Sequence, residues 1–160
     1  ERGYYVFSPF LAKELMEQES AANAEDFIQG NVAPFYRVFG ADAVLFTIIH
    51  RWEKVALRSK IEIDVEYLLR STKTGDMLFS RRFEGAVDLS SDQGGRGILS
   101  TLMDIVVGAI STSMTDKVVA ARLANRDALE SLPAGAYHPR YLQDKRDQVG
   151  PTHVTGRNLK

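Results

Sequence analysis

Three features of this chain could do chemistry: alternating carboxylates, three histidines and a glycine-rich segment. Glu62, Asp64 and Glu66 alternate with apolar residues, so a strand would place all three carboxylates on one face, where they could bind a hard cation. The same face of this strand or of a paired strand would also carry Lys60, Arg70, Arg82 and Glu84. Cross-strand ion pairs account for these residues without a metal. We therefore predict a solvated, ion-paired face and no metal site.

The histidines His50, His138 and His153 have no metal-ligand or catalytic spacing. His50 lies beside Trp52 where an apolar stretch ends, and strand ends are where pockets tend to form. An enzyme acting through such a pocket is one hypothesis. A rim position without a chemical role is the interpretation that we favour, because a single histidine without an orienting partner is a weak sign of catalysis.

The glycine-rich segment is Gly94-Gly95-Arg96-Gly97, which precedes a helical pattern as phosphate-binding loops do. A Walker loop would continue with Lys and Ser or Thr, whereas Ile98 and Leu99 follow here. A flexible connector explains the segment better. Since no nucleophile motif occurs elsewhere, we predict no catalytic residue and no cofactor, and a protein that is not an enzyme.

The clearest structural pattern is a two-residue alternation from Ser59 to Leu89, interrupted by the turn Thr72–Asp76. It predicts a long antiparallel hairpin with one buried and one wet face. The apolar face would carry Ile61, Ile63, Val65, Tyr67 and Leu69 on the first strand and Met77, Phe79, Phe83, Val87 and Leu89 on the second.

The other elements follow from apolar spacing and capping residues. Strands are predicted at Tyr4–Phe7 and Ala43–Arg51, and the second is apolar on both faces up to Ile49, which indicates a central strand. Helices are predicted at Pro9–Glu19, Val32–Phe39 and Ile98–Leu123 or beyond. The expected fold class is α/β, a mixed sheet with a long antiparallel hairpin, packed by two or three helices.

The last of these helices has an apolar arc too wide for a single buried face. One stripe would lie on the sheet, and the second stripe needs another cover: Met103, Val107, Ile110 and Met114. Two covers remain open. One is a neighbouring helix of the same domain, and the other is a subunit or partner interface.

Composition limits the classes of partner and of domain. The 160 residues suit a single α/β domain over residues 1–133, with a polar tail over residues 134–160. A net charge of −1 and scattered basic residues do not indicate nucleic-acid binding. The absence of cysteine excludes disulfides and thiolate chemistry within the chain. Because Tyr4 follows Glu1 so closely, we expect native residues upstream of this sequence, where a signal or lipid anchor would lie.

A family resemblance rests on four segments in order along the chain. Arg2-Gly3-Tyr4-Tyr5-Val6, then Phe39-Gly40-Ala41-Asp42-Ala43-Val44-Leu45, then the turn Thr74-Gly75-Asp76 and the apolar helix resemble a family of bacterial outer-membrane lipoproteins of unknown function, the neisserial vaccine-candidate type. That family is similar in fold to the curli-secretion lipoprotein and to the amino-terminal domain of TolB. In it a signal peptide, a lipidated cysteine and a strand-helix unit precede the glycine-tyrosine strand.

The resemblance implies a location on the periplasmic face of the outer membrane and a role as an interaction module in envelope transport or secretion assembly. Its partners would be other envelope proteins or a homo-oligomer, with membrane contact only through a lipid anchor that is not present in this chain. An activator or adaptor of a cell-wall synthase is the alternative, resting on fold analogy alone. The family supplies no catalytic residues to transfer.

Overall fold

The computed structural model describes residues 2–18, 25–55, 60–88, 112–144, 146–147 and 150–159. The chain divides into two compact units. Unit 1 comprises Glu1–Phe46, Tyr67–Ser80 and Ser131–Gly150, and unit 2 comprises Thr47–Glu66, Arg81–Glu130 and Pro151–Lys160. Strands β1, β2 and β3, defined below, contribute residues to both units, and each unit is described by itself.

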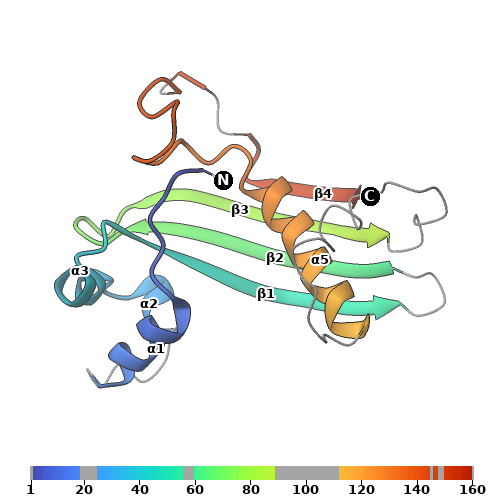
Figure 1. Ribbon diagram of the computed structural model, residues 1–160, viewed down its shortest axis with the longest axis horizontal. Coiled ribbons are helices and arrows are strands. Elements are labelled where there is room, and N and C mark those ends of the chain that lie inside the picture. Colours follow the sequence, from blue (N-terminus) through green and yellow to red (C-terminus); the bar gives the residue numbers. More distant parts are fainter. Residues whose placement is uncertain are drawn as a thin grey trace. The chain divides into compact units, whose positions relative to one another are not determined.

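One four-stranded sheet runs in the order β1-β2-β3-β4 (Figure 1). Its strands are β1 Ala43–Val55, β2 Lys60–Ser71, β3 Met77–Asp88 and β4 His153–Leu159. The hairpin of β2 and β3 is antiparallel, whereas β4 pairs with β3 in parallel, with a register shift between Phe83 and Gly85. The sheet is therefore mixed, and with its helices it confirms the predicted α/β class.

The predicted hairpin is confirmed, and four of the five residues assigned to the buried face of β2 are buried, whereas Leu69 is half-buried and Leu68 on the opposite face is 8% exposed. Ile61, Ile63, Val65 and Tyr67 are each at most 2% exposed, and so are Phe83 and Val87 on β3. The turn is closed by the Ser71 amide, which donates to the Asp76 carbonyl at 2.9 Å, and by Gly75, whose φ of 78° is readily adopted only by glycine. Met77 departs from the prediction: it is 51% exposed because it begins the strand directly after the turn.

Strand β1 corrects the prediction of a central strand covered on both faces. It lies at the end of the sheet order, next to β2 alone. Its side chains alternate: Phe46 is buried and Ile48 half-buried, while Leu45 is 41% and Ile49 61% exposed. The unbroken apolar run resembled a doubly covered strand, but burial on one face is what the described residues show.

Strand β4 was not predicted, since residues 134–160 were interpreted as a polar tail. Val154 lies opposite Phe83 and Leu159 opposite Val87, which is a parallel pairing between segments far apart in sequence. Only these two residues of β4 are strongly apolar, so the period-two signal is weak. The boundary at residue 133 stays a prediction, although β4 shows that the sheet takes a strand from beyond it.

Unit 1 contains three short helices: α1 Pro9–Gln18, α2 Asp26–Gln29 and α3 Ala33–Phe39. Helix α1 begins at Pro9 and helix α3 ends at Phe39, as predicted. Gly40 ends α3 with φ 66° while its amide donates to the Tyr36 carbonyl at 2.8 Å. The carboxyl end of α2 is held by Arg70, whose Nη1 donates to the carbonyls of Phe27, Ile28 and Gly30 at 2.9–3.0 Å.

Unit 2 contains α5, Thr112–Ala128, which contacts β4 and crosses in front of the strands in Figure 1. Its buried residues recur at helical spacing, which gives it an apolar stripe: Val119, Ala120, Leu123, Ala124 and Ala128. The helix confirms the carboxyl half of the predicted one, while residues 98–111 lie outside the described residues. None of the described helices is both long and apolar enough to cross a membrane.

Candidate functional site

The wet face of the hairpin is ion-paired, as predicted. Asp64 and Arg82 form a bidentate pair across β2 and β3, with Nε to Oδ1 at 2.9 Å and Nη2 to Oδ2 at 2.8 Å. Asp64 is only 8% exposed, and the hydrogen bond from Arg82 lowers the pKa of its carboxyl. Because the carboxylate is fixed and fully engaged by one guanidinium, it is a structural group rather than a free acid or base.

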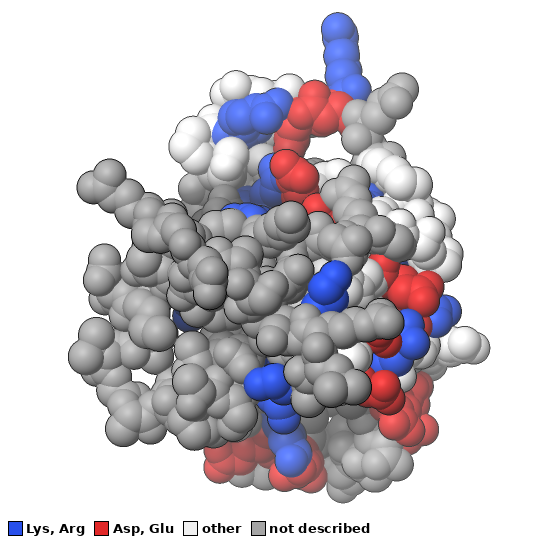
Figure 2. All heavy atoms as spheres, turned by 90° about the vertical axis from the view of Figure 1, so that its right-hand side faces the viewer, with Lys and Arg blue, Asp and Glu red and all other residues white. Residues whose placement is uncertain are grey.

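Two further residues of β1 join this face. Arg51 contacts Glu84 at 3.2 Å and Glu62 at 3.7 Å, and His50 Nε2 lies 3.0 Å from Glu66 Oε2. We call the set the charged face: His50, Arg51, Glu62, Asp64, Glu66, Arg82 and Glu84. All belong to unit 2. Figure 2 also shows basic and acidic side chains close together among the described residues of the face that it displays.

The charged face offers little for catalysis. The His50–Glu66 pair has the geometry of a base and its orienting carboxylate, which the sequence did not reveal because the two residues lie 16 positions apart. Such a pair acts only beside a nucleophile, a metal or a bound substrate. Within the part of the chain that the structure describes, no group of three His, Cys, Asp or Glu side chains could hold a metal ion. The rim interpretation of His50 stays a prediction.

The predicted interaction stripe falls mostly beyond what is described. Met103, Val107 and Ile110, like the segment Gly94–Gly97, lie outside the described residues. Met114 lies in the first turn of α5, where the course of the backbone alone is described. The stripe stays a prediction.

A second surface was not predicted at all. Residues 2–8 form no strand, contrary to the strand expected at Tyr4–Phe7, because their backbone pairs with a turn instead of the sheet. The amide of Gly135 donates to the Arg2 carbonyl at 2.7 Å and that of Tyr137 to the Gly3 carbonyl at 2.9 Å. None of the described strands pairs with the segment, and residues 4–8 are exposed.

Glycine and tyrosine residues fix the position of this extended segment. Gly3 has φ 72°, and a Cβ on it would overlap the backbone of His138, so only glycine fits the close approach. The Tyr4 hydroxyl donates to the Pro133 carbonyl at 2.8 Å, and partial burial raises the pKa of this phenol. The segment is thus held firmly against residues 133–138 of unit 1.

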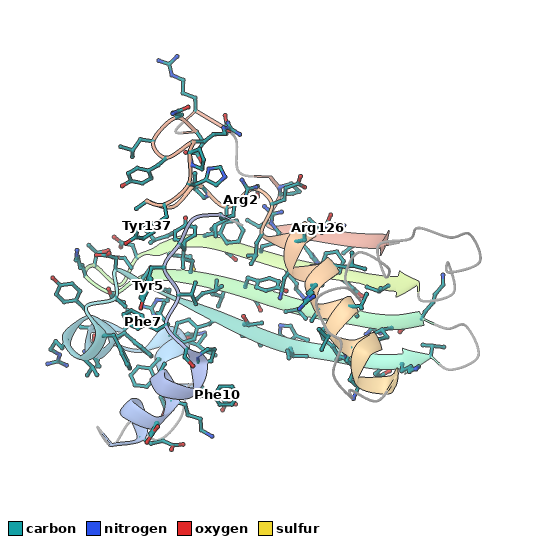
Figure 3. The ribbon with its side chains drawn as sticks, in the orientation of Figure 1. Arg2, Tyr5, Phe7, Phe10, Arg126 and Tyr137 are labelled. Carbon is teal, nitrogen blue, oxygen red and sulfur yellow. The ribbon has the colours of Figure 1, made fainter. Side chains whose placement is uncertain are left out.

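Strongly exposed aromatic or apolar side chains come from this segment, from the first turn of α1 and from the turn at residue 137. Exposed fractions are 73% for Tyr5, 77% for Val6, 86% for Phe10 and 78% for Tyr137. Phe7 is less exposed, because its ring packs 5.7 Å from that of Phe39 and 5.4 Å from that of Tyr5. We define the aromatic surface as Tyr4, Tyr5, Val6, Phe7, Phe10 and Tyr137. Figure 3 shows four of these side chains, those of Tyr5, Phe7, Phe10 and Tyr137.

This surface is the strongest candidate for function in the described residues. Single exposed apolar side chains are common, but several on one firmly held segment indicate a contact surface. The sequence signal was the run Tyr4-Tyr5-Val6-Phe7, whose composition suits a buried strand equally well. Exposure therefore could be recognised only from the structure.

Comparisons with known proteins agree on one relationship. A protein from Neisseria meningitidis serogroup B, "Putative lipoprotein NMB1124/NMB1162", is 28% identical over 119 residues, which are 73% of this chain and 54% of that protein. The chain thus spans about half the length of this curated relative. The crystal structure of lipoprotein GNA1162 from Neisseria meningitidis matches with a TM-score of 0.44 and 25% identity over 69% of this chain and 75% of that one.

The family comparison confirms the resemblance seen in the sequence. The matching description names a lipoprotein and no enzymatic activity, and lipoproteins are held at a membrane of the cell envelope by attached lipid. The predicted likeness to TolB and to the curli-secretion lipoprotein stays a prediction. The family model described as "Putative lipoprotein GNA1162-like" matches residues 1–136, and the chain therefore belongs to this lipoprotein family.

Proposed function

We propose that the protein is a non-catalytic interaction module of an envelope transport or secretion assembly, facing the periplasm from the outer membrane. The observation that carries the proposal is the aromatic surface. Enzymes concentrate apolar side chains around a concave site, whereas these side chains are exposed to solvent. A surface of this kind contributes binding free energy only when another molecule covers it.

The ion pairs of the charged face support the same proposal. Arg82 holds Asp64 ionised, and Arg51 contacts both Glu62 and Glu84, so three of that face's four carboxylates lie against a guanidinium group. In catalytic carboxylates, burial or nearby like charges more often bring the pKa close to the pH at which the enzyme works. The charged face therefore fits a solvated sheet surface better than an active site.

Membership of a lipoprotein family supports a location at a membrane of the cell envelope. The choice of the outer membrane and of its periplasmic side is part of the proposal. Protein partners would contact the aromatic surface and, as a second contact, the stripe Met103, Val107, Ile110 and Met114. A stripe of this length is typical of helix-to-helix contacts between proteins.

The test is the protein mass of the complex that the full-length, lipid-anchored protein forms when extracted from membranes with mild detergent, measured by light scattering. The proposal predicts a mass above that of one chain. Val107→Asp should reduce the mass to that of one chain with the fold retained, because a charge cannot be buried in an apolar contact. His50→Gln is the matched control and should leave the mass unchanged. One-chain mass for all three proteins would refute the proposal.

A further inference from the structure

His138 lies where the turns over residues 133–144 meet the extended segment 2–8. Its amide donates to the Gly135 carbonyl at 2.9 Å, and the neighbouring Tyr137 amide donates to the Gly3 carbonyl at 2.9 Å. A Cβ on Gly3 would overlap the backbone of His138, so the two backbones are in close contact. A change at His138 therefore acts directly on the residues that hold the segment.

The imidazole of His138 stabilises these turns through its unprotonated nitrogen. Nδ1 accepts a hydrogen bond from the Arg140 amide, with 3.1 Å between the two nitrogens, so the ring is neutral and carries its hydrogen on Nε2. The same turn is closed by the Tyr141 amide, which donates to the His138 carbonyl at 2.9 Å. Protonation of Nδ1 would turn this acceptor into a second donor, and the hydrogen bond from Arg140 would be lost.

The charged groups of both segments do not compensate for that loss. Over residues 2–8 and 133–147 cations outnumber carboxylates, with two carboxylates against Arg2, Arg140, Lys145 and Arg146. Of the carboxylates, Asp144 accepts from the Ala134 amide and acts on the Tyr4 phenol, and Asp147 pairs with Arg140 Nη2 at 2.8 Å. Among the described residues, neither carboxylate pairs with the imidazole, so a protonated His138 would add one more positive charge to a region with an excess of them.

We propose that His138 is a pH-sensitive contact that regulates the aromatic surface. The neutral ring fixes the turns that hold residues 2–4, and its protonation in mild acid weakens that hold. Histidine takes up a proton between about pH 5 and 8, a range in which the tyrosine and aspartate side chains of both segments do not titrate. Because the bond from Arg140 stabilises only the neutral ring, the hold is complete above this range and is lost as the pH falls through it. The inference rests on the proposed function, since it concerns the surface through which the protein would act.

Two variants at residue 138 separate the hydrogen-bond acceptor from the titration. Asparagine carries its amide oxygen on Cγ, as histidine carries Nδ1, and it accepts from the amide two residues further on without titrating. His138→Asn should therefore hold the segment in neutral solution and in mild acid alike. Phenylalanine keeps a ring and removes the acceptor, so His138→Phe should hold the segment weakly in both. His153→Asn is the matched control, because His153 lies on β4 in unit 2.

The experiment is hydrogen exchange of the full-length protein in mild detergent, read at the amides of Gly135 and Tyr137 in neutral solution and in mild acid. Proteins are compared at the same pH, so the intrinsic pH dependence of exchange cancels. At about pH 7.5 the wild type and His138→Asn should exchange alike. At about pH 5 the wild type should exchange about two- to tenfold faster than His138→Asn, as expected for the loss of one hydrogen bond. His138→Phe should exchange faster at both pH values, and His153→Asn should respond to pH as the wild type does.

The outcomes separate this inference from the proposed function, because exchange at these amides needs no bound partner. Equal exchange of the wild type and His138→Asn in mild acid would overturn the inference, and so would a pH response that His153→Asn abolishes. If either occurred while the complex extracted from membranes kept a mass above one chain, the proposed function would stand without this regulation. The expected exchange together with one-chain mass would support the pH-sensitive contact and refute the proposed function.

Discussion

Asp64 and Arg82 show how one residue pair can set a pH dependence. Arg82 lowers the pKa of Asp64 in the folded state. The ionised carboxylate therefore stabilises the fold at pH values above 3.8, the ordinary pKa of the group. That stabilisation is lost as the pH falls from there through the lowered, folded-state pKa.

Asp64→Asn should therefore lower the melting temperature most at neutral pH, and its difference from the wild type should shrink below about pH 4. Thermal unfolding followed by circular dichroism over a pH series would measure this. Asp42→Asn is the control, because the Lys73–Asp42 pair is exposed on both sides. A difference that stayed constant down to acidic pH would contradict the role given to Asp64.

Tyr67 has the opposite behaviour at alkaline pH. It is 2% exposed, and burial raises the pKa of its phenol to about 12. Between pH 10 and about 12 the unfolded chain ionises this phenol while the folded chain keeps it neutral, so stability falls over that range.

In Tyr67→Phe this loss should be absent. The drop in melting temperature between about pH 9 and about pH 11.5, a range that includes the ordinary phenol pKa of about 10, should be smaller than in the wild type. An identical drop in both proteins would show that other groups control alkaline unfolding.

At the scale of elements, the extended segment 2–8 depends on one glycine. Gly3→Ala would place a methyl group against the His138 backbone and force alanine into the left-handed region. We expect the amides of Gly135 and Tyr137 to exchange faster, with a stability loss above the roughly 1–2 kcal/mol that the left-handed conformation costs by itself.

Gly40→Ala isolates that conformational part, because Gly40 has φ 66° and a Cβ there would meet nothing within 4 Å. Hydrogen exchange by mass spectrometry would compare the two variants. Equal exchange at residues 135–137 in Gly3→Ala, Gly40→Ala and the wild type would show that Gly3 does not hold the segment.

Two phenylalanines contrast a core element with the aromatic surface. Phe83 of β3 is fully buried and Phe10 is 86% exposed. Phe83→Ala should cost about 3–5 kcal/mol of unfolding free energy, and Phe10→Ala less than about 0.5 kcal/mol. Urea unfolding would measure both. A large loss in Phe10→Ala would mean that the ring is part of the core and that the aromatic surface is not free for binding.

The sequence predicted those elements whose signal is local. The hairpin followed from alternation between Ile61 and Val87, and α3 from its capping by Gly40, because side-chain periodicity and backbone conformation at these sites depend on near neighbours. Three features depend instead on long-range contacts: the pairing of β4 with β3, the end position of β1 and the non-strand conformation of Tyr4–Phe7. For β4 and for Tyr4 the contacting residues lie more than 60 positions away in the sequence. Alternation carries no information on such partners.

The candidate sites divide in the same way. The cross-strand ion pairs were predictable, because the hairpin register follows from its turn. The aromatic surface was not, since Tyr5 and Phe7 are residue types that fill buried strands and exposed contact surfaces alike. What decides between them is the pairing of the Arg2 and Gly3 carbonyls with residues 135–137, and this is a long-range contact.

At the scale of the whole molecule, we propose that the protein works through its aromatic surface and not through the charged face. The Arg2 and Gly3 carbonyls accept hydrogen bonds, but among the described residues no amide of residues 2–8 donates a backbone hydrogen bond, so these amides should exchange quickly in the free chain. A partner that covers the surface would slow that exchange. If the charged face were catalytic, substrate binding would instead slow hydrogen exchange in β2.

The most direct measurement is hydrogen exchange of the full-length, lipid-anchored protein in native membranes, compared with this chain in free solution. If the aromatic surface is the contact surface, residues 2–10 and 135–138 should gain protection, and exchange at Glu62–Glu66 should stay unchanged. Unchanged exchange over residues 2–10 together with added protection around His50 and Glu66 would contradict it, and would direct attention to the charged face as the working site.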